Sequence, residues 1–370
     1  MTRDAAPASG LPVGFNKDIS NLWLSVTDAC NQRCRYCFVR KGQAMMSFDT
    51  ARAAIDFFLA APEVHKRIDY YGGEPLLNAA LLARSMPYAV KQAQARGLDL
   101  RTYMSTNATL YTPAMTFLRD CQVHVLVSID GDRETHDAVR RFAGGGPTHD
   151  TVVAAFRSMQ EHLEQERLCA LFTVTPQRVA AMAANFQYLT DLGFRSINVE
   201  PERCPSWTPE ARERFAAELA AVIAQVEASV EGPPERRIFL NFVSHELAGL
   251  NGTVDRQRHC PFYRNLIVYP DGVMATPPTI VFEEMRDLFM VGDVTRGLFP
   301  TYAACAYDPE TSLCRQCHRK GVQVELSRDH GVHHLRNQLL RELTERLVKA
   351  ASWDPLSADY IRDSQRWTYV

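Results

Sequence analysis

Three closely spaced cysteines are the residues of this chain with the clearest capacity for chemistry. Cys30, Cys34 and Cys37 form a Cys-x3-Cys-x2-Cys pattern. Thiolates are the usual ligands of iron–sulfur clusters, so three on one loop can hold three corners of a cubane cluster. No fourth cysteine is nearby, which leaves one iron open to a substrate or cofactor. Short cysteine clusters also bind zinc, so a zinc knuckle or reduced buried thiols are the alternatives.

A second motif, Gly72-Gly73-Glu74-Pro75, follows a predicted strand at residues 68–71. Two glycines let a backbone approach a ligand without a Cβ atom in the way. Glu74 offers a carboxylate for a charge-assisted hydrogen bond from an ammonium group, and Pro75 ends the strand. Alone, the motif also fits an ordinary strand-to-helix turn. Its position one helix length after the cysteine loop links the two motifs.

The cysteine spacing, with an aromatic residue before the last cysteine, and the Gly-Gly-Glu motif together resemble the signature of radical S-adenosylmethionine (radical SAM) enzymes. The resemblance implies that the three cysteines bind a [4Fe-4S] cluster whose open iron binds SAM. It also implies that an electron from this cluster cleaves SAM to a 5′-deoxyadenosyl radical. The SAM-binding residues implied by these two motifs are Tyr36, Gly72, Gly73 and Glu74.

A third stretch resembles the TNGT, S-x-DG and HDxxR elements of radical SAM enzymes with a C-terminal SPASM or twitch extension, especially sulfatase and peptide maturases. The resemblance implies SAM contacts for Thr106, Asn107, Ser128 and Arg140. Ala108 stands where glycine is usual, and we expect its methyl group to be tolerated. The alternative for Arg140 is a surface salt bridge.

Composition points to a globular protein with a sizeable core. The chain has 370 residues, of which 46% are hydrophobic and 23% charged, and its net charge is −2. This charge implies no bulk attraction to nucleic acid or to an anionic membrane. No apolar run approaches the roughly 18 residues of a membrane span, and the N-terminus lacks the apolar core of a signal peptide. Ten cysteines without an export signal indicate metal binding or catalysis in the cytoplasm.

Strand-like and helix-like segments alternate from residue 22 to about residue 200. Such alternation predicts a parallel sheet with crossover helices, similar to the partial (β/α)6 TIM-like barrel of radical SAM proteins. The motifs all fall at predicted strand C-termini, where such barrels carry their chemistry. The predicted strands cover residues 22–26, 68–71, 98–104, 124–129, 170–174 and 196–199, and the predicted helices 48–59, 77–95, 151–163 and 211–230.

Three regions follow from this organisation. Residues 1–20 are predicted to be a flexible lead-in, residues 21–234 the radical SAM barrel, and residues 235–370 a small twitch- or SPASM-like iron–sulfur domain with a C-terminal helix. The run from Leu266 to Met274 predicts a hairpin with an Asp-Gly turn.

Four C-terminal cysteines are enough for one auxiliary [4Fe-4S] cluster, which the resemblance implies: Cys260, Cys305, Cys314 and Cys317. Pro277 stands where the related domains have a cysteine, so Cys305 is expected to replace that ligand. A structural zinc at the same cysteines is the alternative. Cys121 and Cys169 are predicted core residues. Cys204, in the loop after the sixth strand, is a candidate for contact with substrate or the auxiliary cluster.

The resemblance implies a peptide maturase that oxidises or cross-links a residue of a short ribosomal precursor peptide. The expected partners are this peptide and a reductant such as flavodoxin or ferredoxin. Because only about twenty residues precede the first strand, the leader of the peptide is expected to be recognised by the core itself or by a separate leader-binding protein. Sulfatase maturation is disfavoured, because Pro278 stands at the position of the matching aspartate. No residue is singled out as a general base among Asp28, Tyr71 and Glu200. A dehydrogenase of a small alcohol or amino sugar and a non-catalytic metal-stapled scaffold remain the alternatives.

Overall fold

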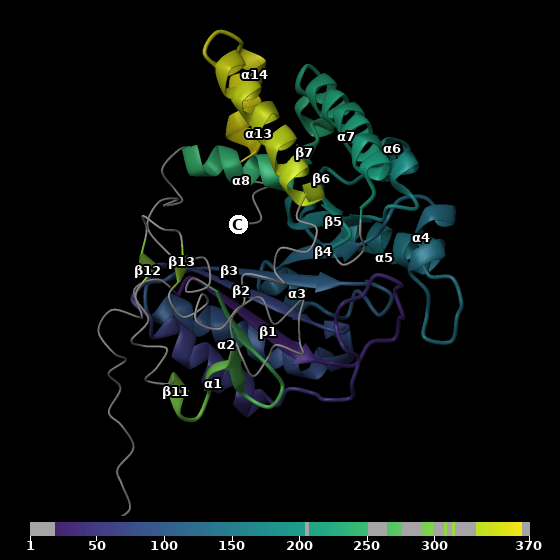
Figure 1. Ribbon diagram of the computed structural model, residues 1–370. Coiled ribbons are helices and arrows are strands. Elements are labelled where there is room, and N and C mark those ends of the chain that lie inside the picture. Colours follow the sequence, from purple (N-terminus) through teal and green to yellow (C-terminus); the bar gives the residue numbers. More distant parts are fainter. Residues whose placement is uncertain are drawn as a thin grey trace, which may run out of the picture.

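The computed structural model describes residues 19–203, 207–250, 265–275, 290–298, 307–308, 313–314 and 331–364. Its centre is a curved parallel sheet in which β1 to β6 lie side by side in chain order, with helices on the outer face (Figure 1). This arrangement confirms the predicted α/β class and the six-stranded partial barrel. None of the described helices combines the length and the apolar character needed to cross a membrane.

The sheet continues beyond these six strands at both edges. β7 pairs in parallel with β6, and β8 pairs in parallel with β1. The strands of this sheet are β1 (Asn21–Thr27), β2 (His65–Gly72), β3 (Asp99–Thr106), β4 (His124–Ser128), β5 (Leu168–Val174), β6 (Ser196–Pro201), β7 (Phe239–Leu240), β8 (Asn265–Val268), β9 (Val273–Ala275), β10 (Met290–Asp293) and β11 (Gly297–Leu298). A separate pair consists of β12 (Tyr307–Asp308) and β13 (Leu313–Cys314).

Helices fill the connections as the sequence periodicity predicts. The α-helices are α1 (Phe48–Leu59), α2 (Ala79–Ala95), α3 (Phe117–Asp120), α4 (Arg133–Val139), α5 (His149–His162), α6 (Met182–Leu192), α7 (Pro209–Val230), α8 (Asn241–Leu250), α13 (Gly331–Ala351) and α14 (Pro355–Ser364). Short 3-10 turns are η1 (Pro75–Asn78), η2 (Gln165–Arg167), η3 (Val179–Ala181) and η4 (Pro234–Arg236). In α1 the Ser47 side chain caps the helix by accepting from the Thr50 amide. One face of this helix is buried and consists of Ala51, Ala54, Ile55, Phe58 and Leu59.

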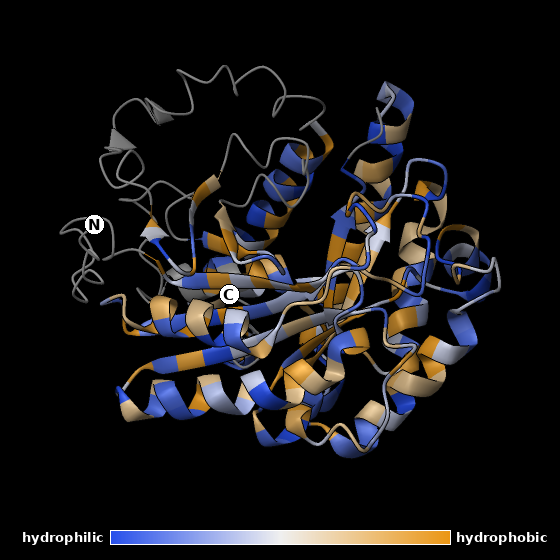
Figure 2. Ribbon diagram, turned by 90° about the horizontal axis from the view of Figure 1, so that it is seen from below, coloured by the Kyte–Doolittle hydropathy of each residue, from blue (hydrophilic) through white to orange (hydrophobic). Residues whose placement is uncertain are grey.

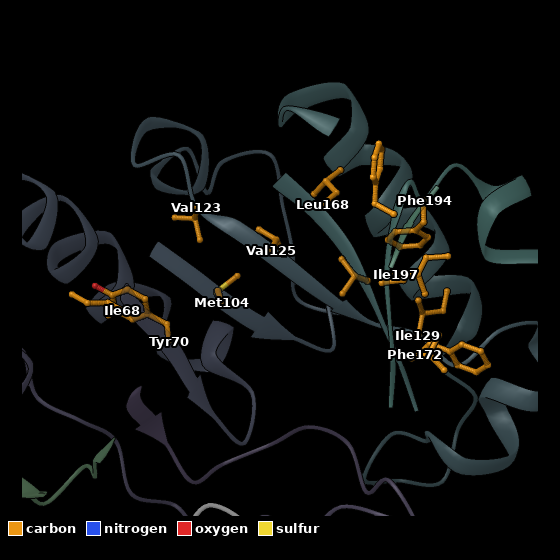
Figure 3. Close-up of a cluster of buried hydrophobic side chains, with 14 of the residues drawn as sticks. Ile68, Tyr70, Met104, Val123, Val125, Ile129, Leu168, Phe172, Phe194 and Ile197 are labelled. Atoms are coloured by element: carbon orange, nitrogen blue, oxygen red, sulfur yellow. The ribbon is translucent and has the colours of Figure 1, made fainter. Parts of the chain in front are cut away.

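Alternate residues of each strand enter two different cores. One face packs against the helices and contains most of the buried apolar side chains. Hydrophobic residues concentrate in the strands and on the helix sides turned toward them (Figure 2). Figure 3 shows part of this layer, with labelled side chains from five adjacent strands, β2 to β6: Ile68, Tyr70, Met104, Val125, Leu168, Phe172 and Ile197. A smaller cluster of Tyr103, Leu126 and Cys169 lies on the opposite, inner face.

The C-terminal part of the chain continues the barrel sheet. The predicted hairpin is present as β8 and β9, with Gly272 at a φ of +84° in its turn. Helix α13 packs against α7 and α8, and α14 lies beside it (Figure 1). The domain boundary at residue 234 stays a prediction, because β7 and β8, which follow this residue in the chain, both extend the barrel sheet.

Candidate active site at the C-terminal ends of the strands

The cysteine loop leaves β1, and its residues Asn31, Arg33 and Arg35 form backbone hydrogen bonds with residues 139–143, at the end of α4 and directly after it. The amides of Arg33 and Arg35 donate to the carbonyls of Arg141 and Val139, both at 2.9 Å. The Ala143 amide donates to the Asn31 carbonyl at 2.8 Å. Because these polar groups are already paired, the loop has a defined shape without any ligand.

The two glycines after β2 permit close contact with this same loop. The Gly73 amide donates to the Thr27 carbonyl and the Glu74 amide to the Ala29 carbonyl, both at 2.8 Å. A Cβ atom on Gly73 would lie 2.0 Å from the Ala29 carbonyl oxygen, and one on Gly72, at a φ of +136°, would lie 2.3 Å from that of Thr27. The sequence predicts that these glycines approach a ligand, whereas in the structure they approach the backbone of Thr27, at the end of β1, and of Ala29, directly after it.

The Glu74 carboxylate is completely buried and ties β2 to β3. One oxygen accepts from the Leu76 amide at 3.0 Å and from the Thr106 hydroxyl at 2.6 Å, and the other accepts from the Asn107 amide at 2.7 Å. Burial raises the pKa of Glu74, and these three hydrogen bonds act in the opposite direction. Three of the roughly four acceptor positions of a carboxylate are therefore used within the protein.

Asn107 extends this connection to the cysteine loop. Its side-chain amide donates to the Asn31 side chain at 2.9 Å and lies 3.9 Å from the Cys30 sulfur. Asn31 in turn donates to the Thr109 hydroxyl at 2.9 Å. Ala108 has a φ of +61° and is fully buried, so its methyl group is accommodated in a conformation that favours glycine.

A buried carboxylate that the sequence reasoning missed, Asp130, organises the other side of the loop. Asp130 follows β4 and is 0% exposed. It accepts from the Tyr36 hydroxyl at 2.5 Å, from the Thr173 amide at 3.0 Å, and from Arg140 at 2.8 and 3.3 Å. The sequence feature that could have identified Asp130 is its place as the acidic residue of the S-x-DG element, directly after an apolar strand.

Arg140 lies in the interior, so the surface salt bridge considered for it is wrong. Its side chain is 7% exposed and its guanidinium pairs with both oxygens of Asp130. The remaining terminal nitrogen lies 4.0 Å from the Cys34 sulfur, and the guanidinium carbon lies 5.1 Å from the centre of the Tyr36 ring. Ser128, the last residue of β4, is 9% exposed. Arg140 and Asp130, which are buried, and Tyr36, which is partly exposed, thus form one connected group beside Cys34.

His136 of the HDxxR element is hydrogen-bonded to Asp130 and, through Thr148, is connected to Arg140. Its Nδ1 accepts from the Asp130 amide at 3.2 Å, and its Nε2 lies 3.0 Å from the Thr148 hydroxyl. That hydroxyl donates to the Arg140 carbonyl at 3.0 Å. Burial, the largest cause, lowers the pKa of His136 to about 4. The hydrogen bonds therefore require a neutral imidazole with its proton on Nε2.

The neutral state of His136 predicts an acid-sensitive fold. In the unfolded chain a histidine titrates near pH 6.5, so the lowered pKa contributes stability above that pH and the contribution is lost as the pH falls toward 4. The full contribution of His136 to the free energy of unfolding is about 3 kcal/mol. His136→Asn keeps an acceptor and removes the titration. Denaturant unfolding of the cluster-free protein should show a shallower loss of stability from pH 6.5 to 4 in this variant, and an unaltered slope contradicts the assignment. His334→Asn, at an exposed position of α13, is the control.

The candidate bases differ in their surroundings. Burial raises the pKa of Tyr71 far above its ordinary value. Burial also acts to raise the pKa of Glu200, but the Arg336 guanidinium, 2.5 Å away on α13, is the main opposing cause and the net shift is downward. Glu200 is thus held as a carboxylate in an ion pair. Asp28 lies in the cysteine loop segment, where its amide donates to the Ala44 carbonyl at 3.0 Å.

The three loop thiols fit a cubane cluster. Cys30, Cys34 and Cys37 are free, partly exposed and close enough to interact electrostatically. Burial raises the pKa of Cys30 and Cys34, while Lys41 and Arg140 respectively favour their thiolate forms. Across the described ranges, no three His, Cys, Asp or Glu side chains converge as ligands of a single ion. Ligands of a cubane sit on different irons and need no such convergence.

The other cysteines divide into two groups. Cys121 and Cys169 are buried, which confirms them as core residues. Of the ligands predicted for an auxiliary cluster, Cys260, Cys305 and Cys317 lie outside the described residues, and Cys314 is described by its backbone, in β13. Cys204 and Pro277 also lie outside the described residues.

Comparison with known proteins identifies the domain that carries this site. The sequence model of the Radical SAM superfamily matches residues 24–183. An uncharacterized protein of Methanocaldococcus jannaschii is 29% identical over 49% of this chain and 62% of its own. The cysteine-type anaerobic sulfatase-maturating enzyme of Clostridium perfringens is 22% identical over 48% of this chain and 50% of its own. The chain spans about half the length of the curated relatives that it matches.

Solved structures show the same fold. Native anSMEcpe with bound AdoMet and Cp18Cys peptide is 16% identical, with a TM-score of 0.69 over 90% of this chain and 99% of its own. Streptococcus suis SuiB bound to precursor peptide SuiA is 13% identical, with a TM-score of 0.53 over 81% of this chain and 70% of its own. The matched residues include the cysteine loop and all the elements around it. This chain therefore contains a domain of the radical SAM superfamily.

Proposed function

We propose that this protein cleaves SAM reductively and uses the resulting radical to abstract hydrogen from a residue of a ribosomally synthesised precursor peptide, giving an oxidative cross-link or a related modification. The observation that carries the proposal is the loop with Cys30, Cys34 and Cys37, held in shape at the C-terminal end of β1. The residues at the ends of β2, β3 and β4 adjoin it, where parallel barrels carry their chemistry.

Each part of the chain has a defined task in this proposal. Cys30, Cys34 and Cys37 hold a [4Fe-4S] cluster, which when bound supplies the electron that cleaves SAM. Asp130, which accepts from Tyr36 and Arg140, and the backbone of residues 139–143 hold the cysteine loop on one side. Asn107 holds the loop on the other side through its hydrogen bond to Asn31. Preorganised positioning of this kind matters because a carbon radical reacts with any C–H bond placed close to it.

The peptide substrate is supported by the kind of protein that shares the fold. Both solved structures described above contain a bound peptide in addition to the shared barrel. We also propose an auxiliary [4Fe-4S] cluster that accepts the electron left by C–H oxidation of the substrate. Its ligands in this proposal are Cys260, Cys305, Cys314 and Cys317. A flavodoxin or ferredoxin is the proposed reductant, and a separate leader-binding protein remains a proposed partner.

The experiment is SAM turnover in the presence of candidate substrates. Anaerobically reconstituted protein with dithionite should release 5′-deoxyadenosine, and a co-expressed precursor peptide should lose the mass of two hydrogens. A small alcohol or amino sugar that is oxidised in stoichiometric amounts, with no change in the peptide, overturns the peptide proposal. Absence of any 5′-deoxyadenosine from protein that holds its iron overturns the radical assignment as well.

The proposed contact between Glu74 and the SAM ammonium group can be separated from the structural role of this residue. Glu74→Gln replaces one acceptor oxygen by a donor, so the Leu76 and Thr106 donors or the Asn107 amide lose their acceptor. We expect a loss of unfolding free energy of about 1–3 kcal/mol in the cluster-free protein, together with weaker SAM binding by the reconstituted protein. Equilibrium binding measures the second effect, and unchanged SAM affinity assigns Glu74 to structure alone. Glu227→Gln, at a partly exposed pair with Arg346, is the control.

A further inference from the structure

Gln32 is a buried amide inside the cysteine loop with one polar atom left unpaired. The residue is 1% exposed, and its backbone forms a β-bridge with Phe142 that fixes its place. Its amide N–H donates to the Cys30 sulfur at 3.4 Å, and its side-chain oxygen lies 3.5 Å from the Cys34 sulfur. Within the described part of the chain, the side-chain nitrogen Nε2 has no hydrogen-bond partner.

This arrangement suits a thiol but not a metal-bound thiolate. A thiol can donate its S–H to the Gln32 oxygen, as the 3.5 Å separation indicates. A thiolate bound to iron has no S–H, so the carbonyl oxygen would then face sulfur lone pairs. Rotating the terminal amide by 180° exchanges the oxygen and Nε2 without changing the shape of the side chain. Nε2 has no partner to lose on rotation and gains the sulfur as its acceptor.

We propose that Gln32 is a redox-tuning residue, whose side-chain N–H donates to the Cys34 thiolate of the cluster and raises the cluster's reduction potential. The proposal rests on the assignment of the three loop cysteines as cluster ligands. Hydrogen bonds to sulfur are among the factors by which proteins set the potentials of iron–sulfur clusters. Arg140 already approaches the same sulfur at 4.0 Å, so Gln32 supplies a second, neutral donor. A higher potential makes the cluster easier for the electron donor to reduce.

Two variants test the proposal through the potential itself. Gln32→Met keeps an unbranched side chain of similar size and removes the donor, and Gln32→Glu keeps an acceptor and adds a negative charge. Redox titration follows the electron paramagnetic resonance signal that changes on SAM addition, which distinguishes this cluster from an auxiliary one. We expect Gln32→Met to shift the reduction equilibrium three- to tenfold toward the oxidised cluster, where tenfold is about 59 mV for one electron. Gln32→Glu should shift it further in the same direction.

The stability of the cluster-free protein separates tuning from a merely structural role. Without the cluster, Gln32→Met removes the buried unpaired nitrogen and also the weak hydrogen bond from the Cys34 thiol to the Gln32 oxygen, so its melting temperature should stay close to that of the wild-type protein. A lower melting temperature with an unchanged potential overturns the proposal, as does altered SAM affinity at constant potential. A shift in Gln32→Glu alone reflects added charge and also overturns it. Gln94→Leu, on the exposed end of α2, is the control. Failure of the wild-type protein to assemble this cluster is a different result, which refutes the ligand assignment instead.

Discussion

Replacing Cys30, Cys34 and Cys37 together by alanine is expected to abolish the release of 5′-deoxyadenosine. The three thiols sit on one loop whose backbone–backbone hydrogen bonds to residues 139–143 do not involve the sulfurs, so the loop should keep its shape while losing its cluster ligands. Reconstituted wild-type protein with two cubanes should contain about eight irons, and the triple variant about four, the content of one cluster. Anaerobic assays of 5′-deoxyadenosine and of iron and sulfide measure both effects.

The buried cysteines supply the matched control. A Cys121→Ala and Cys169→Ala double variant changes the same atoms in the core, away from the loop, and should retain its iron and its turnover. Continued 5′-deoxyadenosine release by the triple variant contradicts the assignment of the loop as the cluster site. Zinc without sulfide in the triple variant supports a structural metal, in place of an auxiliary cluster, at the C-terminal cysteines.

The second large effect is expected from Asp130→Asn. Asp130 is fully buried and compensates the charge of Arg140 while accepting from Tyr36 and Thr173. Removing one partner of a buried ion pair typically costs about 3–5 kcal/mol, because the other charge stays uncompensated. We expect a loss of this size in denaturant unfolding of the cluster-free protein. Because Tyr36 stands between two cluster cysteines, the variant should also lose iron faster on exposure to a chelator.

Two further variants separate charge burial from other causes. Asp150→Asn removes the partner of Arg133 in an exposed pair with an N–O distance of 2.5 Å, and should have a much smaller effect. Adding Arg140→Met to Asp130→Asn removes the uncompensated charge and should restore part of the stability. Equal losses of unfolding free energy for Asp130→Asn and Asp150→Asn refute the proposed role of burial. The same conclusion follows if adding Arg140→Met to Asp130→Asn restores no stability.

The sequence by itself determined the fold class and many of the residues that meet at the site, though not Asp130. Strand alternation and helix periodicity are local patterns, which is why the predicted elements match β1 to β6, α1, α2, α5 and α7 within a few residues. Because strands that follow one another in the chain are neighbours in the parallel sheet, their C-terminal ends lie at the same edge of the sheet. The cysteine spacing and the motifs at strand ends needed no further information, since each is contained in a few consecutive residues.

The tertiary structure alone decided what each of these residues touches. Glu74 holds the ends of two strands together, and the glycines before it approach the cysteine loop. The pairing of β8 with β1 joins segments more than two hundred residues apart, and Gln32 meets Phe142 across a connection of more than a hundred. A hydrogen bond or ion pair depends on position in space to within a few tenths of an ångström. Local sequence patterns fix the elements, whereas only the packing of all the elements fixes those positions.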